Sequence, residues 1–309
     1  MSIATVTLNP AIDETVTLDK LTAGTVHRAR TASLNAGGKG INVASCLADW
    51  GAPVTVTGVL GADNANIFEV LFQSKAIEDR FVRVPGRTRN NIKIVDSQVT
   101  TDINLPGLTI PADLMARVET IISGFRGIVV LSGSLPEDCP ADFYARLTTR
   151  LVQAGSKVVV DTSGEPLAKV LSAPVLPFCI KPNLKELAEW AGKSLDNPEA
   201  VVEEVKKLRR RGVGLVVVSM GESGALFASQ EGAVIAKLPA TGVTSTVGAG
   251  DAMVAGIVAA LDERASLERI ARLSTAFAVA KLGFSGAHLP KKAEIEKLAS
   301  EVLVIDVKK

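Results

Sequence analysis

One carboxylate, Asp251, stands directly after the small residues Gly248, Ala249 and Gly250 and directly before the apolar segment AMVAGIVAAL (252–261). Small residues at the start of a helix leave several backbone N–H groups free to bind an anion, and the helix dipole adds to the attraction. Asp251 could then be a favourable charge in the first turn, worth about 0.3–1 kcal/mol. It could also be a base that takes a proton from an attacking hydroxyl while the amides stabilise the transferred group.

A second glycine-rich stretch, NAGGKGINVA (35–44), places Lys39 directly after Gly37 and Gly38. The stretch is not a Walker loop, because the four-residue gap of G-x-x-x-x-G-K-[ST] and its Ser or Thr are missing. It is not a dinucleotide fingerprint either, because the third glycine lacks the required spacing. A ligand could still approach this backbone closely, with Lys39 as a cation and Asn42 as both donor and acceptor.

Two further segments carry polar residues that have both a structural and a functional explanation. In KPNLKEL (181–187), Asn183 and Glu186 share one face of the helix expected there. They could cap that helix, or they could hold Mg²⁺ through water and nucleotide phosphates. The segment VSMGESGA (218–225) predicts a strand and a tight turn, which could be a plain hairpin or the floor of a nucleotide site.

Residues 12–35 and 87–106 alternate polar and apolar side chains without a helical period, which predicts strands with one solvated or ligand-facing side. We expect these strands to form a small separate sheet over the main fold. Charged residues on exposed strands are usually solvated. Here they would also suit a phosphorylated sugar, because cations bind phosphate whereas Asp and Asn bind hydroxyls. The residues concerned are Asp13, Arg28, Arg89, Asn91 and Lys93.

Elsewhere in the chain, short β-branched apolar runs alternate with helical patterns. Continuous apolar runs predict strands covered on both faces, and their alternation with helices predicts a doubly wound α/β sandwich with a parallel sheet. The predicted strands are 3–8, 54–60, 127–133, 157–163 and 214–220. The predicted helices are 40–50, 64–75, 112–123, 141–153, 184–191, 199–210, 249–262 and 267–282.

Composition argues against several classes of function. The 34 Lys and Arg residues balance 33 Asp and Glu residues, so no overall field recruits nucleic acid or an acidic membrane. The basic patch KKLRRRG (206–212) is isolated and fits the solvated end of a helix. Three scattered cysteines argue against a disulfide framework, and two histidines argue against a multi-histidine metal site. The chain shows no signal-peptide pattern or membrane span, so we expect a cytoplasmic protein.

Taken together, the motifs resemble those of the ribokinase-like (PfkB) carbohydrate kinases along the whole chain. The most specific signature is STVGAGDAMVAG (245–256), while TLNPAID (7–13) and GRTRNNIK (86–93) point to the branch that acts on phosphosugars. The remaining matches are GGKGIN (37–42), SGSLP (132–136), KPNLKE (181–186) and SMGESGA (219–225). The resemblance implies a single domain over 1–309. It also implies a three-layer α/β/α sandwich with a mainly parallel central sheet, and a small β-sheet lid formed by the segments 12–35 and 87–106.

The family pattern implies that the γ-phosphoryl group of ATP is transferred, with Mg²⁺, to a sugar hydroxyl. It makes Asp251 the catalytic base and the amides of Gly248, Ala249 and Gly250 the anion hole. The implied sugar-phosphate contacts are Asp13, Arg28, Gly37, Gly38, Lys39, Asn42, Arg89 and Asn91. The implied nucleotide contacts are Lys181, Asn183, Ser219, Gly221, Gly224, Thr246, Gly248 and Gly250. Asn183 and Glu186 would act on Mg²⁺ through water and phosphates.

The resemblance also implies a substrate and an assembly. The leading expectation is phosphorylation of fructose 1-phosphate to fructose 1,6-bisphosphate, with tagatose 6-phosphate and fructose 6-phosphate as alternative acceptors because their kinases share these motifs. A non-catalytic sugar-phosphate or nucleotide sensor is the alternative of a different class. In several relatives the lids of two subunits pair and a basic residue near Arg28 reaches the neighbouring site, so a homodimer is implied. Around the adenine, where relatives often have an Asn, this chain has Lys281, Phe284 and Ser285.

Overall fold

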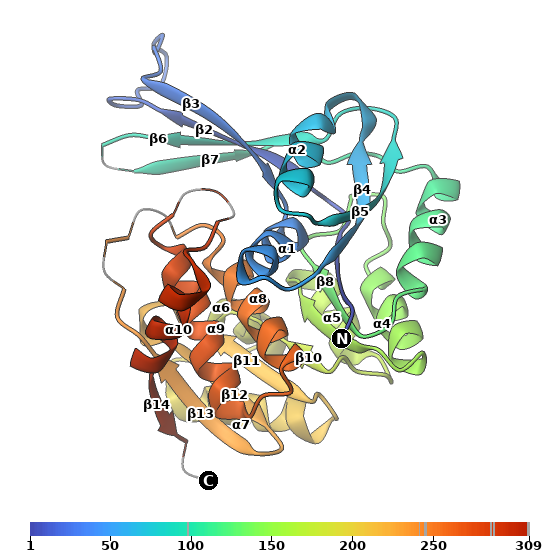
Figure 1. Ribbon diagram of the computed structural model, residues 1–309, viewed down its shortest axis with the longest axis vertical. Coiled ribbons are helices and arrows are strands. Elements are labelled where there is room, and N and C mark those ends of the chain that lie inside the picture. The colour runs from blue at the N-terminus through green and yellow to red at the C-terminus, as the bar shows by residue number, and fades with distance from the viewer. Residues whose placement is uncertain (98, 241, 244–245, 285, 287, 308–309) are drawn as a thin grey trace.

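The computed structural model describes residues 1–97, 99–240, 242–243, 246–284, 286 and 288–307, and its central feature is one long sheet (Figure 1). The strands of this sheet lie in the order β14-β13-β12-β11-β10-β9-β8-β1-β4-β5. Neighbours from β11 to β5 pair in parallel, whereas β12, β13 and β14 extend the sheet antiparallel. The strands are β1 Ile3–Thr7, β4 Thr55–Gly61, β5 Glu78–Val84, β8 Ile128–Ser132, β9 Lys157–Asp161, β10 Cys179–Ile180, β11 Leu215–Ser219, β12 Ala225–Ser229, β13 Gly232–Lys237 and β14 Leu303–Asp306.

Helices cover both faces of this sheet and complete the expected three-layer α/β/α sandwich. On one face lie α1 Lys39–Trp50, α2 Asn66–Ser74, α8 Ala249–Asp262, α9 Leu267–Lys281 and α10 Lys292–Glu301. On the other lie α3 Ala112–Ser123, α4 Phe143–Gln153, α5 Gly164–Ser172, α6 Leu184–Ala191 and α7 Pro198–Arg210. Among the described residues, no helix has the length and apolar character that a membrane crossing requires.

Alternate residues of a central strand face opposite helical layers, which explains the continuously apolar strand sequences. On β8, Ile128 and Val130 belong to one buried cluster, whereas Val129 and Leu131 belong to the other. Because both faces of such a strand are buried, its side chains are apolar on both faces and do not alternate with polar ones. Helix α8 is apolar almost all round for a similar reason, because it packs between α1 and α9.

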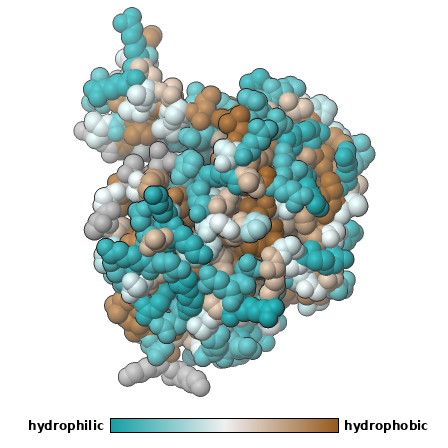
Figure 2. Space-filling view, in the orientation of Figure 1, coloured by the Kyte–Doolittle hydropathy of each residue, from teal (hydrophilic) through white to brown (hydrophobic). Residues whose placement is uncertain are grey.

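A second, smaller sheet has the strand order β3-β2-β6-β7 and projects from the body as a narrow arm (Figure 2). Strands β2 and β6 pair in parallel, whereas the two outer pairs are antiparallel. The strands are β2 Ala11–Thr17, β3 Thr31–Gly37, β6 Arg89–Val95 and β7 Thr100–Asn104. Both lid segments therefore form the expected small sheet, although residues 18–30, in the middle of the first segment, form no strand.

The register of the small sheet separates a polar face from an apolar face. Asp13 is level with Asn35 on one side and with Asn91 on the other. One residue along, Glu14 is level with Leu34 and Ile92, and Ile92 is level with Ile103. Residues level across a sheet share a face, and successive residues alternate between faces. The Asp and Asn side chains thus share one face, and Leu34, Ile92 and Ile103 share the other.

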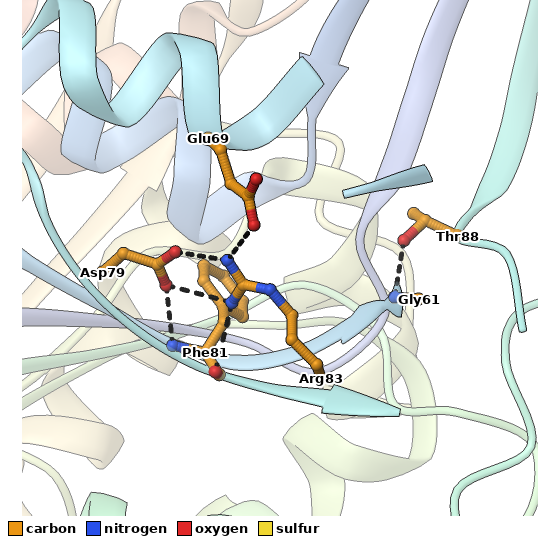
Figure 3. A network of polar contacts seen from close by, with 6 residues as sticks. All are labelled: Gly61, Glu69, Asp79, Phe81, Arg83 and Thr88. Carbon is orange, nitrogen blue, oxygen red and sulfur yellow. Dashed lines mark hydrogen bonds and ion pairs between the residues drawn. The ribbon is translucent and has the colours of Figure 1, made fainter. Parts of the chain in front are cut away.

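A buried junction fixes the point where β6 leaves the body of the protein. The Gly61 N–H, at the end of β4, donates to Oγ1 of Thr88 at 2.9 Å, and Thr88 immediately precedes β6 (Figure 3). The Asn64 side chain donates to the Thr88 carbonyl at 2.9 Å and accepts from the Thr88 N–H at 2.8 Å. Nearby, Arg83 on β5 pairs with Glu69 on α2 at 2.9 Å. Because Thr88 is held by three hydrogen bonds, the position of Arg89, the first residue of β6, is fixed as well.

Candidate functional site

The carboxyl edge of the parallel strands gathers polar residues from distant parts of the chain. Asp161 ends β9, Lys181 follows β10 and Ser219 ends β11. Helix α8 begins beside them, because a Cβ placed on Gly250 would lie 3.5 Å from Nζ of Lys181. Open α/β sheets bind their ligands at this edge. The candidate site is therefore the space in front of these strand ends and the N-terminus of α8.

The N-terminus of α8 presents unpaired backbone donors. Gly248 caps the helix with a φ of 80°, a left-handed conformation that favours glycine. The Ala249 N–H reaches the Thr246 carbonyl only at 3.5 Å, and the N–H groups of Gly250 and Asp251 have no acceptor in the described part of the chain. Free amides at the positive end of a helix form an anion-binding site. The free Gly250 amide therefore fits the predicted anion hole and the Asp251 amide is a further donor beside it, while anion contacts at Gly248 and Ala249 stay a prediction.

Asp251 is buried in the first turn of α8 and is held by a side chain of another helix. Nδ2 of Asn42 on α1 donates to its Oδ2 at 2.8 Å. Burial, followed by the neighbouring Asp161 charge, raises the pKa of Asp251 from the usual 3.8 to about 6. A carboxyl with such a pKa is ionised at neutral pH and accepts a proton more readily than an ordinary aspartate. A residue placed only to suit the helix dipole would not need burial or an orienting partner.

Asp161, which the sequence reasoning did not single out, connects two of the predicted site lysines. Its carboxylate is fully buried and lies 3.3 Å from Nζ of Lys39 and 3.2 Å from Nζ of Lys181. Burial opposes ionisation of Asp161, but Lys181 and Lys39 together hold its pKa below the usual value. In return, Asp161 raises the pKa of Lys39. The available signal was the run KVVVD (157–161), in which a charge ends a buried strand.

The glycines around Lys39 have a packing role. A Cβ on Gly38 would lie 2.8 Å from Cγ2 of Thr7, and one on Gly40 would lie 2.5 Å from Oγ1 of the same residue. A Cβ on Gly37 would lie 2.5 Å from Oδ2 of Asp13. These glycines thus allow close packing around β1 and β2. Ligand contacts at Gly37 and Gly38 stay a prediction.

On the polar face of the small sheet, three predicted residues form one chain of hydrogen bonds. Nη1 of Arg89 donates to Oδ1 of Asn91 at 2.9 Å, and Nδ2 of Asn91 donates to Oδ1 of Asp13 at 3.2 Å. Burial raises the pKa of Asp13 and lowers that of Arg89. Nε of Arg89 is buried and has no hydrogen-bond partner among the described residues. An unsatisfied guanidinium donor of this kind fits an anionic ligand.

The predicted nucleotide side is built around turns. Asn183 and Glu186 form a reciprocal capping box at the start of α6, with both hydrogen bonds at 2.8 Å, so the structural explanation of this pair is confirmed. Asn183 also forms an isolated bridge with Ser219. Gly221 and Gly224 form the turn between β11 and the antiparallel β12. A Cβ on Gly224 would lie 2.2 Å from the Ala236 carbonyl oxygen, which explains this glycine by packing.

The donors present fit a hydrated Mg²⁺ better than a directly ligated one. Across the described residues, no three His, Cys, Asp or Glu side chains gather as a metal site. Glu186 lies near enough to the Lys39 ammonium to raise its pKa further. Asn183 and Glu186 thus offer oxygens at the site, while each oxygen used by the cap keeps a second lone pair. Such a pair suits Mg²⁺ that keeps its waters and binds phosphates.

One predicted position, Arg28, is not joined to this cluster by any described contact. Arg28 is exposed in the segment between β2 and β3. Near the adenine, Ser285 lies outside the described residues, whereas Lys281 and Phe284 are described. Sugar contact at Arg28 therefore stays a prediction.

This fold and site define a class of protein. Residues 6–294 match the model of the pfkB family carbohydrate kinases, and the chain belongs to this family. It is a kinase that transfers phosphate to an alcohol acceptor. The chain is 48% identical over 308 residues to a 1-phosphofructokinase of Xanthomonas campestris, covering 97% of each, and 45% identical over 310 residues to one of Rhodobacter capsulatus, covering 98% of each. It is also similar to the crystal structure of phosphofructokinase-2 from Escherichia coli in complex with potassium, with a TM-score of 0.91 and 28% identity, covering 97% of this chain and 98% of that one.

Proposed function

We propose that the protein is an ATP-dependent sugar-phosphate kinase that converts fructose 1-phosphate to fructose 1,6-bisphosphate. The observation that carries the proposal is the buried Asp251 carboxyl, which Asn42 orients. This carboxyl lies in the same helical turn as the free backbone amides of Gly250 and Asp251. Curated relatives named 1-phosphofructokinase over nearly the full length support the choice of acceptor.

The chemistry of transfer follows from what each group can do. Asp251 accepts the proton of the acceptor hydroxyl as that oxygen bonds to the γ-phosphorus of ATP, while the bond from this phosphorus to the bridging oxygen of ADP breaks. The amides at residues 248–250 stabilise the negative charge on the transferring group. Mg²⁺, bound through water near Asn183 and Glu186, would neutralise phosphate charge. The nucleotide would be bordered by Lys181, Ser219, Gly221, Gly224 and Thr246.

The sugar phosphate would lie between this edge and the polar face of the small sheet. Arg89 would bind the phosphate through its unsatisfied guanidinium donor, and Asp13 and Asn91 would bind sugar hydroxyls. Lys39 and the backbone at Gly37 and Gly38 would form the remaining contacts to the sugar phosphate. The small sheet would act as a lid that excludes water, which otherwise competes with the sugar as acceptor.

We also propose that two copies pair through the apolar face of this lid. Leu34 is 57% exposed and Ile103 is 45% exposed, and both lie on that face. A second copy would cover these side chains, and Arg28 would then be free to reach the neighbouring site.

The function is tested by measuring ADP release from ATP with fructose 1-phosphate, fructose 6-phosphate, tagatose 6-phosphate and ribose, with and without Mg²⁺. We expect the highest kcat/KM with fructose 1-phosphate, and we expect Asp251→Asn to lower kcat by about 10²–10⁴-fold while ATP binding persists. The exposed Asp113→Asn is the matched control and should leave kcat unchanged. A higher kcat/KM with another phosphosugar would identify a different acceptor for a kinase of the same family. Ligand binding without turnover would favour a non-catalytic sensor.

A further inference from the structure

Lys281 is a buried cation beside the anion hole that the mechanism above does not use. It is the last residue of α9, only 4% exposed. A Cβ placed on Gly248 would lie 3.3 Å from Cε and 3.9 Å from Nζ of Lys281. The ammonium therefore lies next to the left-handed glycine that caps α8.

The hydrogen bonding of Lys281 leaves its charge unbalanced. Nζ donates to the Phe284 carbonyl at 2.7 Å, and no Asp or Glu in the described part of the chain lies within ion-pair distance of it. Lys181, which is equally buried, pairs with Asp161 at 3.2 Å. A buried ammonium without a carboxylate is costly, so its presence needs an explanation. An anion that arrives at the neighbouring amides would provide the missing partner.

Several other charges bear on this ammonium. Burial lowers the pKa of Lys281, while the Asp251 carboxylate on α8 acts to raise it; burial raises the pKa of the Cys46 thiol to about 12, so this neighbour is uncharged at neutral pH. His288, which follows α9, has its own pKa lowered by burial and, in part, by Lys281. The pKa of Asp251 is also affected by Asp161, which raises it, and by Lys39 and Lys181, which lower it. Asp251 is thus the carboxylate whose charge acts on the Lys281 ammonium.

We propose that Lys281 is a positioning residue for phosphoryl transfer, whose positive charge supports the neighbouring anion hole and keeps Asp251 ionised. The proposal rests on the proposed kinase function. The charge acts over a short distance in a poorly solvated region, where electrostatic effects are stronger than in water. Because the charge matters most when negative charge accumulates in the transition state, its loss should affect kcat more than the KM for ATP.

The test compares Lys281→Met, which keeps the length of the side chain and removes the charge, with Lys281→Arg, which keeps the charge. We expect Lys281→Met to melt no lower than the wild type, because a buried charge is removed. Its kcat should fall roughly ten- to a hundredfold, and the acidic limb of its kcat/KM profile should move to higher pH, because Asp251 loses a stabilising cation. Lys281→Arg should recover part of kcat and the original limb. The exposed Lys297→Met is the matched control.

A second readout does not depend on turnover by the variants. Calorimetry with ADP and aluminium fluoride, which together imitate the transferring group, should show at least roughly tenfold weaker binding to Lys281→Met than to the wild type. A kcat within twofold of the wild type with an unchanged acidic limb would overturn the inference. So would failure of both Lys281→Met and Lys281→Gln to fold, because Lys281 would then be structural. A wild type that neither turns over nor binds these probes would instead refute the kinase proposal itself.

Discussion

At the scale of single residues, the same burial that makes Asp251 useful also makes it costly. The carboxyl is removed from water and lies near Asp161, so ionising it at neutral pH opposes folding. The Asn42 amide and the lysines at Asp161 reduce this cost without removing it. Residues of this kind are expected where activity, and not stability, has determined the side chain.

Replacement of Asp251 by Asn should therefore stabilise the protein at neutral pH. The folded pKa of about 6 lies above the usual 3.8, so the stability contributed by Asp251 is present below about pH 4 and is lost as pH rises through 6. At pH 8 we expect Asp251→Asn to be more stable than the wild type by on the order of 2 kcal/mol, and at pH 4 the difference should largely vanish. Urea unfolding at the two pH values measures this, with Asp113→Asn as control. A variant less stable at pH 8 would contradict it.

Arg89 should act mainly on the binding of the sugar phosphate. Arg89→Ala removes the unsatisfied buried donor and the hydrogen bond to Asn91. We expect the KM for the sugar phosphate to rise about tenfold or more, as for loss of a charged hydrogen bond of about 1.5–3 kcal/mol, while the KM for ATP stays near that of the wild type. Steady-state kinetics with each substrate varied in turn measures both. Arg87→Ala, two residues away and exposed, should change neither, and an unchanged sugar-phosphate KM in Arg89→Ala would remove Arg89 from the site.

Several site residues could be predicted from their own sequence context. Asp251 and Lys39 belong to short motifs in which glycine neighbours draw attention to them, and both lie at the observed site. Asp161 could not be found in this way, because it ends an ordinary strand, and Lys281 could be predicted only as a residue near the adenine, because it ends an ordinary helix. Their importance comes from three-dimensional proximity to Lys39, Lys181 and Gly248, which local sequence does not contain.

At the scale of elements, the predictions succeeded where hydrophobic period and length agreed. The helices from α1 to α4 and from α6 to α9, and the strands β1, β4, β8, β9 and β11, lie within a few residues of the expected ranges. The two-residue β10 is too short to show a pattern, and α5 begins with Gly164, Glu165 and Pro166, which lack an apolar period. Strands β5, β13 and β14 and helix α10 lie towards the edges of the fold, where mixed polarity hid them, whereas the apolar β12 was included only as the segment after a turn.

The junction at Thr88 should control the lid strand that carries Arg89. Thr88→Val removes the acceptor of the Gly61 N–H and leaves a buried donor unsatisfied, at a cost of about 1–3 kcal/mol. Because Arg89 is the next residue, we expect a several-fold rise in the KM for the sugar phosphate, together with a lower melting temperature. Kinetics and thermal unfolding of the purified variant measure the two effects. Thr88→Ser keeps the hydroxyl and should restore most of the binding; equal KM values in both variants would refute the coupling.

At the scale of the whole molecule, the lid offers two chemically different faces. The face with Asp13 and Asn91 would contact the substrate, and the face with Leu34 and Ile103 would contact a second copy. The small sheet was predictable at this scale because both lid segments alternate polar and apolar residues without a helical period. The pairing of β2 with β6 could not be read from the sequence, since it joins segments that lie more than seventy residues apart.

Disruption of the apolar lid face should separate the proposed dimer. Leu34→Glu places a charge among the side chains that a second lid would bury, so we expect a dimeric wild type and a monomeric variant in light scattering after gel filtration. Val70→Glu is a matched control, because Val70 is also 57% exposed but lies on α2. A monomeric wild type, or a variant that stays dimeric, would contradict lid pairing.

The position of Asp161 between Lys39 and Lys181 has a consequence for the protein before any substrate arrives. As a buried counterion, Asp161 balances part of this positive charge, so we expect the site to attract chloride or free phosphate less strongly than two unpaired lysines would. Under the proposed function, substrates would therefore need more than negative charge to bind these lysines. Correctly placed phosphates would contact the free amides and both cations together, whereas anions of another shape would not.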